Sequence, residues 1–296
     1  MSLVVIKTKT DRALDILLYT VLTMAGLVTL FPFYYVIIMS VTPIIEVLKN
    51  GGFVLMPSKF TLVAYKAIFQ SALVPRALQI TAIITIVGTA CNLLVTTLLA
   101  YPLSKKWLPG RNIVLMMIVF TLIFTGGMIP TYLVVKQTGL LNSIWALIIP
   151  SVVSTFNLLI MKSFFESLSE EIQDAAKIDG CNDMQALYHI VLPLCKPILA
   201  TLMLFYGVTH WNEFFNGIMY MSDPKNYPLQ VVLRNMLQQP QISQELLALN
   251  PEARVELPPE TLRMALVVVS TLPMLVIYPF IQKHFTKGMM LGAIKG

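Results

Sequence analysis

The sequence predicts an all-α integral membrane protein, a single transmembrane domain over residues 1–296 whose six helices cross the bilayer. Apolar residues make up 56% of the 296 positions and charged residues only 12%, and the mean hydropathy is +0.75. Soluble domains contain about 45–50% apolar and about 25% charged residues. Because the apolar residues also fall into long stretches, lipid rather than water is predicted to be the main solvent of this chain.

Six apolar stretches are long enough for a membrane span, which needs about 20 residues to cross roughly 30 Å of hydrocarbon as a helix. They are residues 14–41, 78–103, 112–135, 143–164, 198–221 and 262–285. The first stretch exceeds the roughly 7–15 apolar residues of a signal-peptide core, so we expect it to be retained as a span. Gly126, Gly127 and Pro130 interrupt the third stretch, and this break either serves packing alone or turns freed carbonyls towards a cavity.

The charges indicate an orientation with both termini in the cytoplasm. Lysine and arginine concentrate in short segments on that side, among them Lys105, Lys106 and Arg111. These segments account for much of the net charge of +6, and no basic and aromatic stripe typical of a nucleic-acid surface lies outside the spans. The three cysteines and three histidines show no ligand spacing, so neither a disulfide framework nor a metal site is predicted.

The most informative polar segment is residues 163–197, between the fourth and fifth spans. Ser167 and Glu170 have the spacing of a capping box, so a short helix is expected to begin there and to end at Gly180, which can adopt the left-handed conformation that closes helices. Asn182 or Asp183 is expected to cap a second short helix. The apolar residues of that helix recur at i, i+3, i+4 and i+7 and form one stripe, Met184, Leu187, Tyr188 and Val191.

Pro193 and Pro197 are expected to stop this second helix and to begin the fifth span. The product is a pair of short helices lying on the membrane surface, with a small-residue patch at Ala175 and Ala176 that another protein can approach closely. Such an arrangement suits a lever that is pushed from the cytoplasm.

The loop resembles the EAA loop of ABC importer permeases, which is patterned E-A-A-x-x-D-G and then I-x-L-P. The residues that carry the match are Asp174, Ala175, Ala176, Lys177, Asp179, Gly180, Leu192 and Pro193. The resemblance covers nearly the whole chain, and it is closest to carbohydrate permeases related to the second maltose permease, within them those of lipo-oligosaccharide and uronide-oligosaccharide type. Asp174 stands where the family usually has Glu, which keeps the charge, and Cys181 replaces a frequent Ala with another small residue.

The resemblance implies the type I permease fold and a coupling loop, residues 174–197, that docks on a separate ATPase. Its implied partners are a sister permease in a heterodimer, two ATP-binding-cassette ATPase subunits, an extracytoplasmic solute-binding protein, a sugar and membrane lipid, in a bacterial inner membrane. This chain contains no Gly-x-x-x-x-Gly-Lys loop and no Gly-Lys pair. It is therefore expected to be no enzyme and to bind no cofactor, with ATP and Mg²⁺ on the partner ATPases.

Polar and aromatic side chains interrupt the fifth span and define a candidate substrate pathway. They are Tyr206, His210, Trp211, Asn212, Glu213 and Asn216. A carboxylate at this depth costs about 2.5–3.5 kcal/mol, so Glu213 should face the bundle interior or water. Aromatic faces beside amide and carboxylate groups suit a sugar, although Glu213 bonded only to a neighbouring helix and His210 as a packing residue remain open alternatives.

The resemblance implies the import of a sugar, expected to be an oligosaccharide, with an acidic uronide oligomer among the candidates, coupled to ATP hydrolysis on other subunits. The tail residues Lys287, Gly292 and Lys295 are expected to contact the ATPase, because the related maltose permease has such a tail; a frayed terminus is the alternative. Two other classes stay open on the residues alone. One is an ion-coupled secondary transporter that uses Glu213, and the other is a polytopic membrane enzyme, for which no clustered catalytic set is present.

Overall fold

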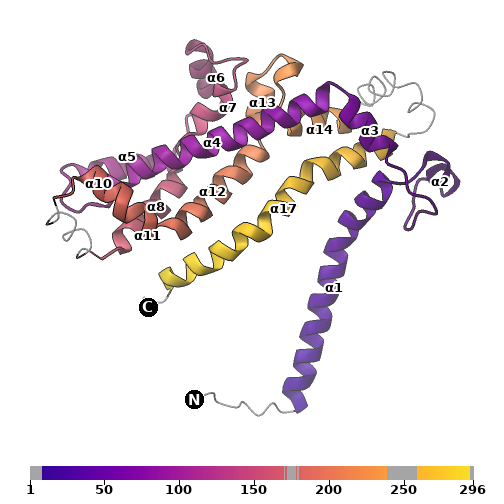
Figure 1. The fold of residues 1–296 in the computed structure, drawn as a ribbon, viewed down its shortest axis with the longest axis horizontal. Helices are drawn as coiled ribbons and strands as arrows, with labels where there is room; N and C mark the ends of the chain where they lie inside the picture. Colours follow the sequence, from indigo (N-terminus) through magenta and orange to yellow (C-terminus); the bar gives the residue numbers. More distant parts are fainter. Residues whose placement is uncertain (1–8, 170, 172–177, 179, 239–258, 294–296) are drawn as a thin grey trace. The chain divides into compact units, whose positions relative to one another are not determined.

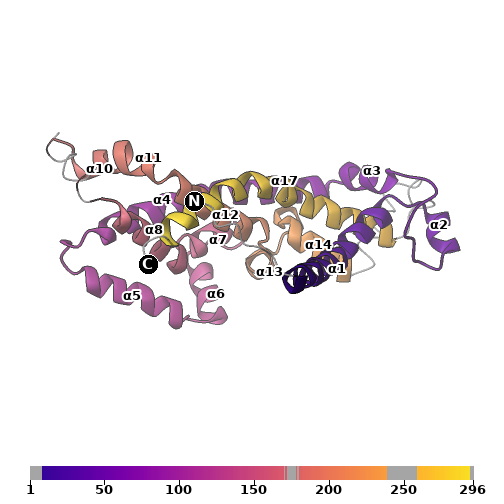
Figure 2. The same ribbon diagram turned by 90° about the horizontal axis from the view of Figure 1, so that it is seen from below.

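A computed structural model describes residues 9–169, 171, 178, 180–238 and 259–293, and the described residues are helical, with no strand among them. The chain divides into two compact units (Figures 1 and 2). Unit 1 comprises Met1–Ser71 and Met236–Val269, and unit 2 comprises Ala72–Asn235 and Ser270–Gly296. Whether the whole chain acts as the single predicted domain stays a prediction.

Unit 1 contains a long apolar helix that is exposed along most of its length. Helix α1, Lys9–Ser40, includes a membrane-length window with a mean hydropathy of 2.0 that is 0% buried. Two short helices, α2 (Ile44–Lys49) and α3 (Val63–Gln70), follow it. Only the end of α1 is packed, where Met39 joins Val47 and Val54 in a small core. An apolar helix of this kind needs lipid or another protein around it.

A hydrogen-bonded turn closes the loop after α2. The backbone N–H of Ser58 donates to Glu46 Oε1 at 2.6 Å, and the Ser58 hydroxyl donates to the same oxygen at 3.0 Å. These bonds favour the charged carboxylate and hold the pKa of Glu46 below its ordinary value.

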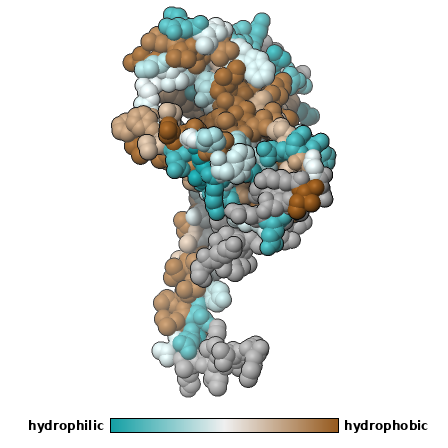
Figure 3. Space-filling model, turned by 90° about the vertical axis from the view of Figure 1, so that its left-hand side faces the viewer, coloured by the Kyte–Doolittle hydropathy of each residue, from teal (hydrophilic) through white to brown (hydrophobic). Residues whose placement is uncertain are grey.

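Unit 2 is built on helix α4, Leu73–Ser104, which packs along α8 (Thr155–Ser167) and α12 (Lys196–Trp211). Figure 1 shows α4 and α12 running alongside each other. One hydrophobic core joins the ends of these helices that are predicted to face the cytoplasm. Its buried residues include Tyr101, Phe165 and Leu202. Many large apolar side chains are also exposed, and brown patches lie among teal residues on the face drawn in Figure 3, as expected for a protein solvated by lipid.

Two of the six predicted spans are bent pairs of helices rather than continuous helices, and a third bent pair joins the end of the predicted coupling loop to α12. Helices α5 (Arg111–Ile123) and α6 (Met128–Gln137) meet at 114°, a bend visible in Figure 2. The fourth span consists of α7 (Trp145–Ile148), the 3₁₀ turn Ile149–Ser151 and α8, bent by 53°. The α10–α11 segment (Asp183–Leu194) meets α12 at 83°. With α1, α4 and α17 (Pro259–Ala293) as unbroken helices, the described residues supply up to six spans.

The predicted fifth span, 198–221, is not one helix. Helix α12 ends at Trp211, and α13 begins at Phe215 and runs to Tyr220. A 3₁₀ turn, Pro224–Asn226, and the amphipathic helix α14, Leu229–Gln238, follow. Asn212, Glu213 and Phe214 therefore occupy a helix break, where polar side chains can reach water or backbone groups that a continuous helix would have paired internally.

Asn142 fastens the α6–α7 connection to the segment after α13. Its backbone φ is +60, the left-handed region that few residues other than Gly and Asn adopt. Its Oδ1 accepts from the backbone N–H of Ser222 at 2.6 Å and of Asp223 at 3.3 Å. The backbone N–H of Asn142 donates to the Tyr220 carbonyl at 2.9 Å. One residue thus ties two broken spans together.

We predict that Asn142→Ala lowers the stability of the purified protein by about 2 kcal/mol or more, because it removes the accepting oxygen and leaves in the left-handed region a residue without the polar side chain that lets Asn tolerate it. Asn142→Gly should cost less, since only the hydrogen bonds are lost, and Asn142→Asp should retain the accepting oxygen. Thermal unfolding in detergent measures all three. An alanine variant as stable as the unmodified protein would contradict the fastening role.

Candidate functional site

The described half of the coupling loop begins with a capped helix, as the sequence predicts. Asn182 Oδ1 accepts from the Gln185 backbone N–H at 2.9 Å, and Gln185 Oε1 accepts from the Asn182 backbone N–H at 2.9 Å. Gly180, just before this capping box, has φ +79. Asp174, Ala175, Ala176, Lys177 and Asp179, the remaining predicted coupling residues before it, lie outside the described residues.

The prediction that four apolar residues form one stripe on this helix is wrong in part. Leu187 and Val191 are buried, whereas Met184 and Tyr188 are more than half exposed. The reason is a π-helical turn over Leu187–Val191, which takes more residues per turn than an α-helix and so rotates Tyr188 out of the buried face. Leu187 and Val191 belong to the same core as Leu202 of α12, so this face of the loop is anchored in the bundle.

The helix ends one residue after Pro193 and Pro197 lies in the first turn of α12, as expected. Pro193 itself lies at the start of the short helix α11, Leu192–Leu194, and the chain bends at Cys195 before α12 begins. The preceding π turn already departs from the regular α-helical hydrogen bonds that a proline would break. Leu192 is half-buried and packs against the core, whereas Pro193 is exposed. We call residues 182–195 the coupling elbow.

A cluster of charges lies beside the core that anchors the coupling elbow. Arg111 forms an ion pair with Glu166, and Lys162 Nζ lies 2.8 Å from the same carboxylate. The Arg111 Nε–H also donates to the carbonyl of Leu103 at 2.8 Å. These contacts join the end of α4, the start of α5 and the end of α8, so the helices around the coupling elbow are held as a group.

Two polar pairs join α4 to α12 inside the bundle. His210 Nε2 lies 2.8 Å from Asn92 Oδ1, and Tyr206 Oη lies 2.7 Å from Thr96 Oγ1. Asn92 also donates its amide N–H to the carbonyl of Ser151 at 2.7 Å. Because that bond turns the Asn92 oxygen towards His210, the imidazole must donate through Nε2. A single asparagine therefore connects α4, α12 and the turn inside the fourth span.

The close approach of the two helices requires a glycine. A Cβ placed on Gly88 would lie 2.6 Å from His210 Nε2 and 2.7 Å from Cε1. Small residues at such contacts let membrane helices approach closely and pack by van der Waals forces. Gly88 thus makes room for the His210 ring, one turn away from the Asn92 side chain that binds it.

The predicted substrate-pathway residues divide into two groups. Tyr206, His210 and Trp211 are buried, and each bonds a neighbouring helix; the Trp211 indole N–H donates to the Ser270 carbonyl at 2.9 Å. Asn212, Glu213 and Asn216 lie in or after the break that follows α12. Glu213 is only 8% exposed. Its two oxygens accept from the backbone and side-chain N–H groups of Asn216, both at 3.2 Å.

Two side chains of α14, which sequence reasoning did not place in the site, complete the polar group after α12. Gln230 Nε2 donates to Asn212 Oδ1 at 3.4 Å, and the Arg234 guanidinium carbon lies 5.2 Å from the centroid of the Phe214 ring. We call Asn212, Phe214, Asn216, Gln230 and Arg234 the polar cluster. Since α12 has 16 residues, it separates this cluster from the coupling elbow by about 24 Å.

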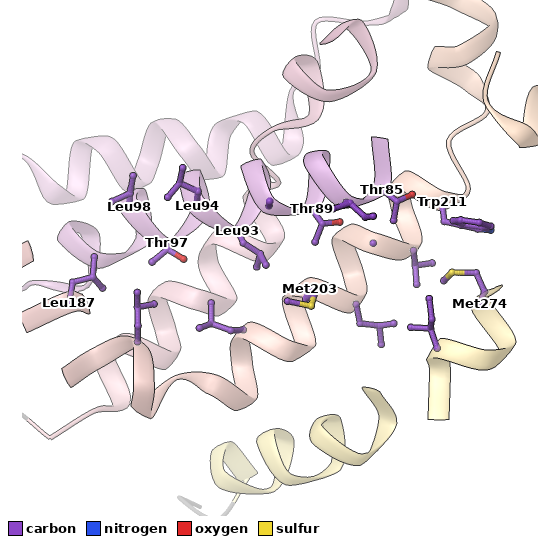
Figure 4. A pocket seen from close by; sticks show the side chains of 18 of the residues that line it. Thr85, Thr89, Leu93, Leu94, Thr97, Leu98, Leu187, Met203, Trp211 and Met274 are labelled. Carbon is purple, nitrogen blue, oxygen red and sulfur yellow. The ribbon is translucent and has the colours of Figure 1, made fainter. Parts of the chain in front are cut away.

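A cavity of about 640 Å³ lies between α4, the coupling elbow, α12 and the α17 residues of unit 2. Leu187 lies at one end and Trp211 at the other (Figure 4). Its lining is mostly apolar, and its few polar groups include the hydroxyls of Thr85, Thr89, Thr97 and Tyr188, so it offers few of the hydrogen-bond partners that sugar hydroxyls need. The polar cluster fits a sugar better than this cavity does.

Other predicted features fall partly outside the described residues. No group of three or more potential metal-ligating side chains occurs among the residues described. The predicted tail residues Lys287 and Gly292 lie in α17, whose backbone is described up to Ala293, and Lys295 lies outside the described residues.

The fold and the site define a multi-pass helical membrane permease, and comparisons place it in a family. Residues 107–291 match the family described as "Binding-protein-dependent transport system inner membrane component". The chain is 44% identical to Protein LplC of Bacillus subtilis (strain 168), over 98% of this chain and 97% of LplC. It is 43% identical to the polygalacturonan/rhamnogalacturonan transport system permease protein YtcP of the same organism, over 97% of this chain and 99% of YtcP.

A solved structure agrees in fold. A chain of a bacterial ABC transporter involved in the import of the acidic polysaccharide alginate superposes with a TM-score of 0.87 at 30% identity, over 95% of this chain and 99% of that chain. This protein belongs to the family of inner-membrane components of binding-protein-dependent transport systems, the permeases of ABC importers. The ion-coupled alternative that uses Glu213 finds no support in these comparisons.

We predict that Gly88→Ala destabilises the protein by about 1–3 kcal/mol, because the new methyl group must displace the His210 ring. Thermal unfolding of a double-mutant cycle with His210→Ala measures the coupling. The cost of Gly88→Ala should shrink in the His210→Ala background, where the ring is gone. Gly26→Ala is the matched control, since nothing lies within 4 Å of that position. Equal costs in both backgrounds would contradict the direct contact.

Proposed function

We propose that this chain forms half of the membrane channel of an ABC importer that moves an oligosaccharide into the cytoplasm. The observation that carries the proposal is the coupling elbow, whose Leu187 and Val191 are buried in one core with Leu202 of α12. A force applied to the elbow therefore reaches the helix that ends at the polar cluster. The sugar class is supported by the names of the relatives, which include a polygalacturonan/rhamnogalacturonan permease and an alginate importer.

The proposed mechanism is a rigid movement of helices driven from the elbow. ATP binding on partner ATPases supplies the free energy, and closure of those subunits pushes the coupling loop, residues 174–197. The elbow and α12 meet at a bend of 83°, so displacement of one arm tilts the other. A switch between inward-facing and outward-facing states needs only that ATP and sugar bind these states with different affinities.

The proposed assembly contains a sister permease, two ATPase subunits and an extracytoplasmic solute-binding protein. ATP and Mg²⁺ bind the ATPases in this scheme, and this chain binds no cofactor and catalyses no hydrolysis. Docking is assigned to Asp174, Ala175, Ala176, Lys177, Asp179, Gly180, Leu192 and Pro193, with a second contact from the tail at Lys287, Gly292 and Lys295. The chain resides in a bacterial cytoplasmic membrane with both termini inside, as its short basic segments favour.

The proposed substrate pathway runs past the break after α12. Asn212 is exposed there, and Asn216 is half-buried beside Glu213. Amide groups can pair with sugar hydroxyls, and the half-buried Phe214 ring offers an apolar face to sugar C–H groups. Tyr206, His210 and Trp211 support this region from within the bundle, since each is buried and bonded to another helix.

Reconstitution in liposomes tests the proposed function. We predict that radiolabelled oligosaccharide enters only when the sister permease, the ATPases, the binding protein and internal-side ATP are all present with this chain. Omission of the ATPases should abolish uptake, because this chain contains no phosphate-binding loop. Uptake by this chain alone, driven by a proton or sodium gradient, would refute the importer and restore the secondary-transporter hypothesis.

We also predict that Gly180→Pro leaves the complex assembled but uncouples ATP hydrolysis from uptake. Gly180 has φ +79, which proline cannot adopt, so the turn at the start of the elbow must change. Gly180→Asn is the matched control, because Asn tolerates the left-handed region and nothing lies within 4 Å of a Cβ at this position. Uptake and ATP hydrolysis are measured in the same liposomes. Full uptake in the proline variant would contradict the proposal that the coupling loop acts as a lever.

A further inference from the structure

Arg234 and Gln230 present one face of α14 towards the helix break after α12. They are four residues apart and so lie one turn apart on the same side of the helix. The opposite side is packed, with Leu229 and Val232 at 0% and 2% exposure. The packed side fixes the rotation of α14, and Gln230 and Arg234 are left half-buried.

Arg234 is held by an aromatic ring rather than by an acid. Its guanidinium carbon lies 5.2 Å from the centroid of Phe214, within the range of a cation–π contact. Among the residues that the structure describes, no carboxylate lies within ion-pair distance of Arg234. Glu213, the neighbour of Phe214 in the chain, accepts from Asn216 instead. Contact with a ring face leaves the in-plane N–H donors of a guanidinium free for an anion.

The neighbouring groups suit the rest of a sugar. Asn212 and Gln230 bond each other through one amide oxygen and one amide N–H at 3.4 Å, which is long for such a bond. Both amides retain further donors and acceptors that can pair with hydroxyls. The cluster therefore combines one fixed cation with two adaptable amides and an aromatic ring.

We propose that Arg234 binds the carboxylate of an acidic oligosaccharide as the sugar passes the break after α12, and that this contact selects uronate-containing sugars over neutral ones. The inference rests on the proposed function, because it assigns a substrate class to the same transport pathway. It differs from long-range steering by surface charge, since the planar guanidinium contacts the sugar directly and can bind a carboxylate through two parallel hydrogen bonds.

The test compares variants in the reconstituted complete importer, with a galacturonate trimer and its methyl-esterified, uncharged form as the two sugars. Arg234→Gln should lower uptake of the charged trimer at subsaturating concentration by roughly ten- to a hundredfold. Uptake of the uncharged trimer should fall much less, because that sugar offers no carboxylate to the guanidinium. Uptake of the charged trimer by Arg234→Lys should lie between that of the unmodified complex and that of Arg234→Gln, because an ammonium keeps the charge but not the paired donors.

Lys225→Gln is the matched control for charge, since Lys225 is an exposed cation in the 3₁₀ turn before α14. Its effect should be small and should vanish in about 0.5 M salt, where exposed charges are screened, whereas the Arg234→Gln effect should persist. Three results would overturn the assignment: equal effects of the two variants, equal loss of charged and uncharged sugar, or no uptake of the charged trimer by the unmodified complex while another sugar is taken up. Absence of ATP-dependent uptake of every sugar tested would instead refute the proposed function itself.

Discussion

The contact between α4 and α12 is the interaction on which the second unit depends. Gly88 lets the His210 ring lie against α4, and Asn92 binds both that ring and the Ser151 carbonyl. A lipid-solvated protein gains little from burying apolar surface, so close packing and internal hydrogen bonds must hold the helices together. Gly88 provides the close packing and Asn92 provides the hydrogen bonds. Together they determine where α12 lies relative to α4 and to the fourth span.

The position of α12 in turn determines the relation between the two functional regions. One end of α12 follows the coupling elbow, which is anchored by Leu187 and Val191, and the other end opens into the polar cluster. A helix is stiff along its axis because each backbone group is paired within it. In the proposed mechanism, movement at the elbow is therefore transmitted to the cluster, whereas a flexible connection of the same length would absorb it.

The two spaces beside α12 differ in chemistry. The cavity lined by Leu187, Met203 and Trp211 offers few polar partners for a sugar. The break after α12 presents amides, a ring and a guanidinium that forms no ion pair with the described residues. The Glu213 carboxylate accepts from the backbone N–H of Asn216, so this backbone group is paired although the helix is interrupted.

The sequence alone determined the all-α membrane class, the number of apolar stretches and a helix that begins at Asn182 or Asp183, and its loop motif resembles that of ABC importer permeases, because these follow from composition, local hydrogen bonding and a contiguous motif. Local patterns could not determine the π turn that exposes Tyr188, or the end of α12 at Trp211, since both depend on packing against other helices. Asn92 was detectable as an amide within an apolar stretch, but its partners His210 and Ser151 lie 118 and 59 residues away in the chain. Only the tertiary structure brings such distant groups within hydrogen-bond reach, and the same holds for Arg234, whose role follows from the ring beneath it rather than from its neighbours in sequence.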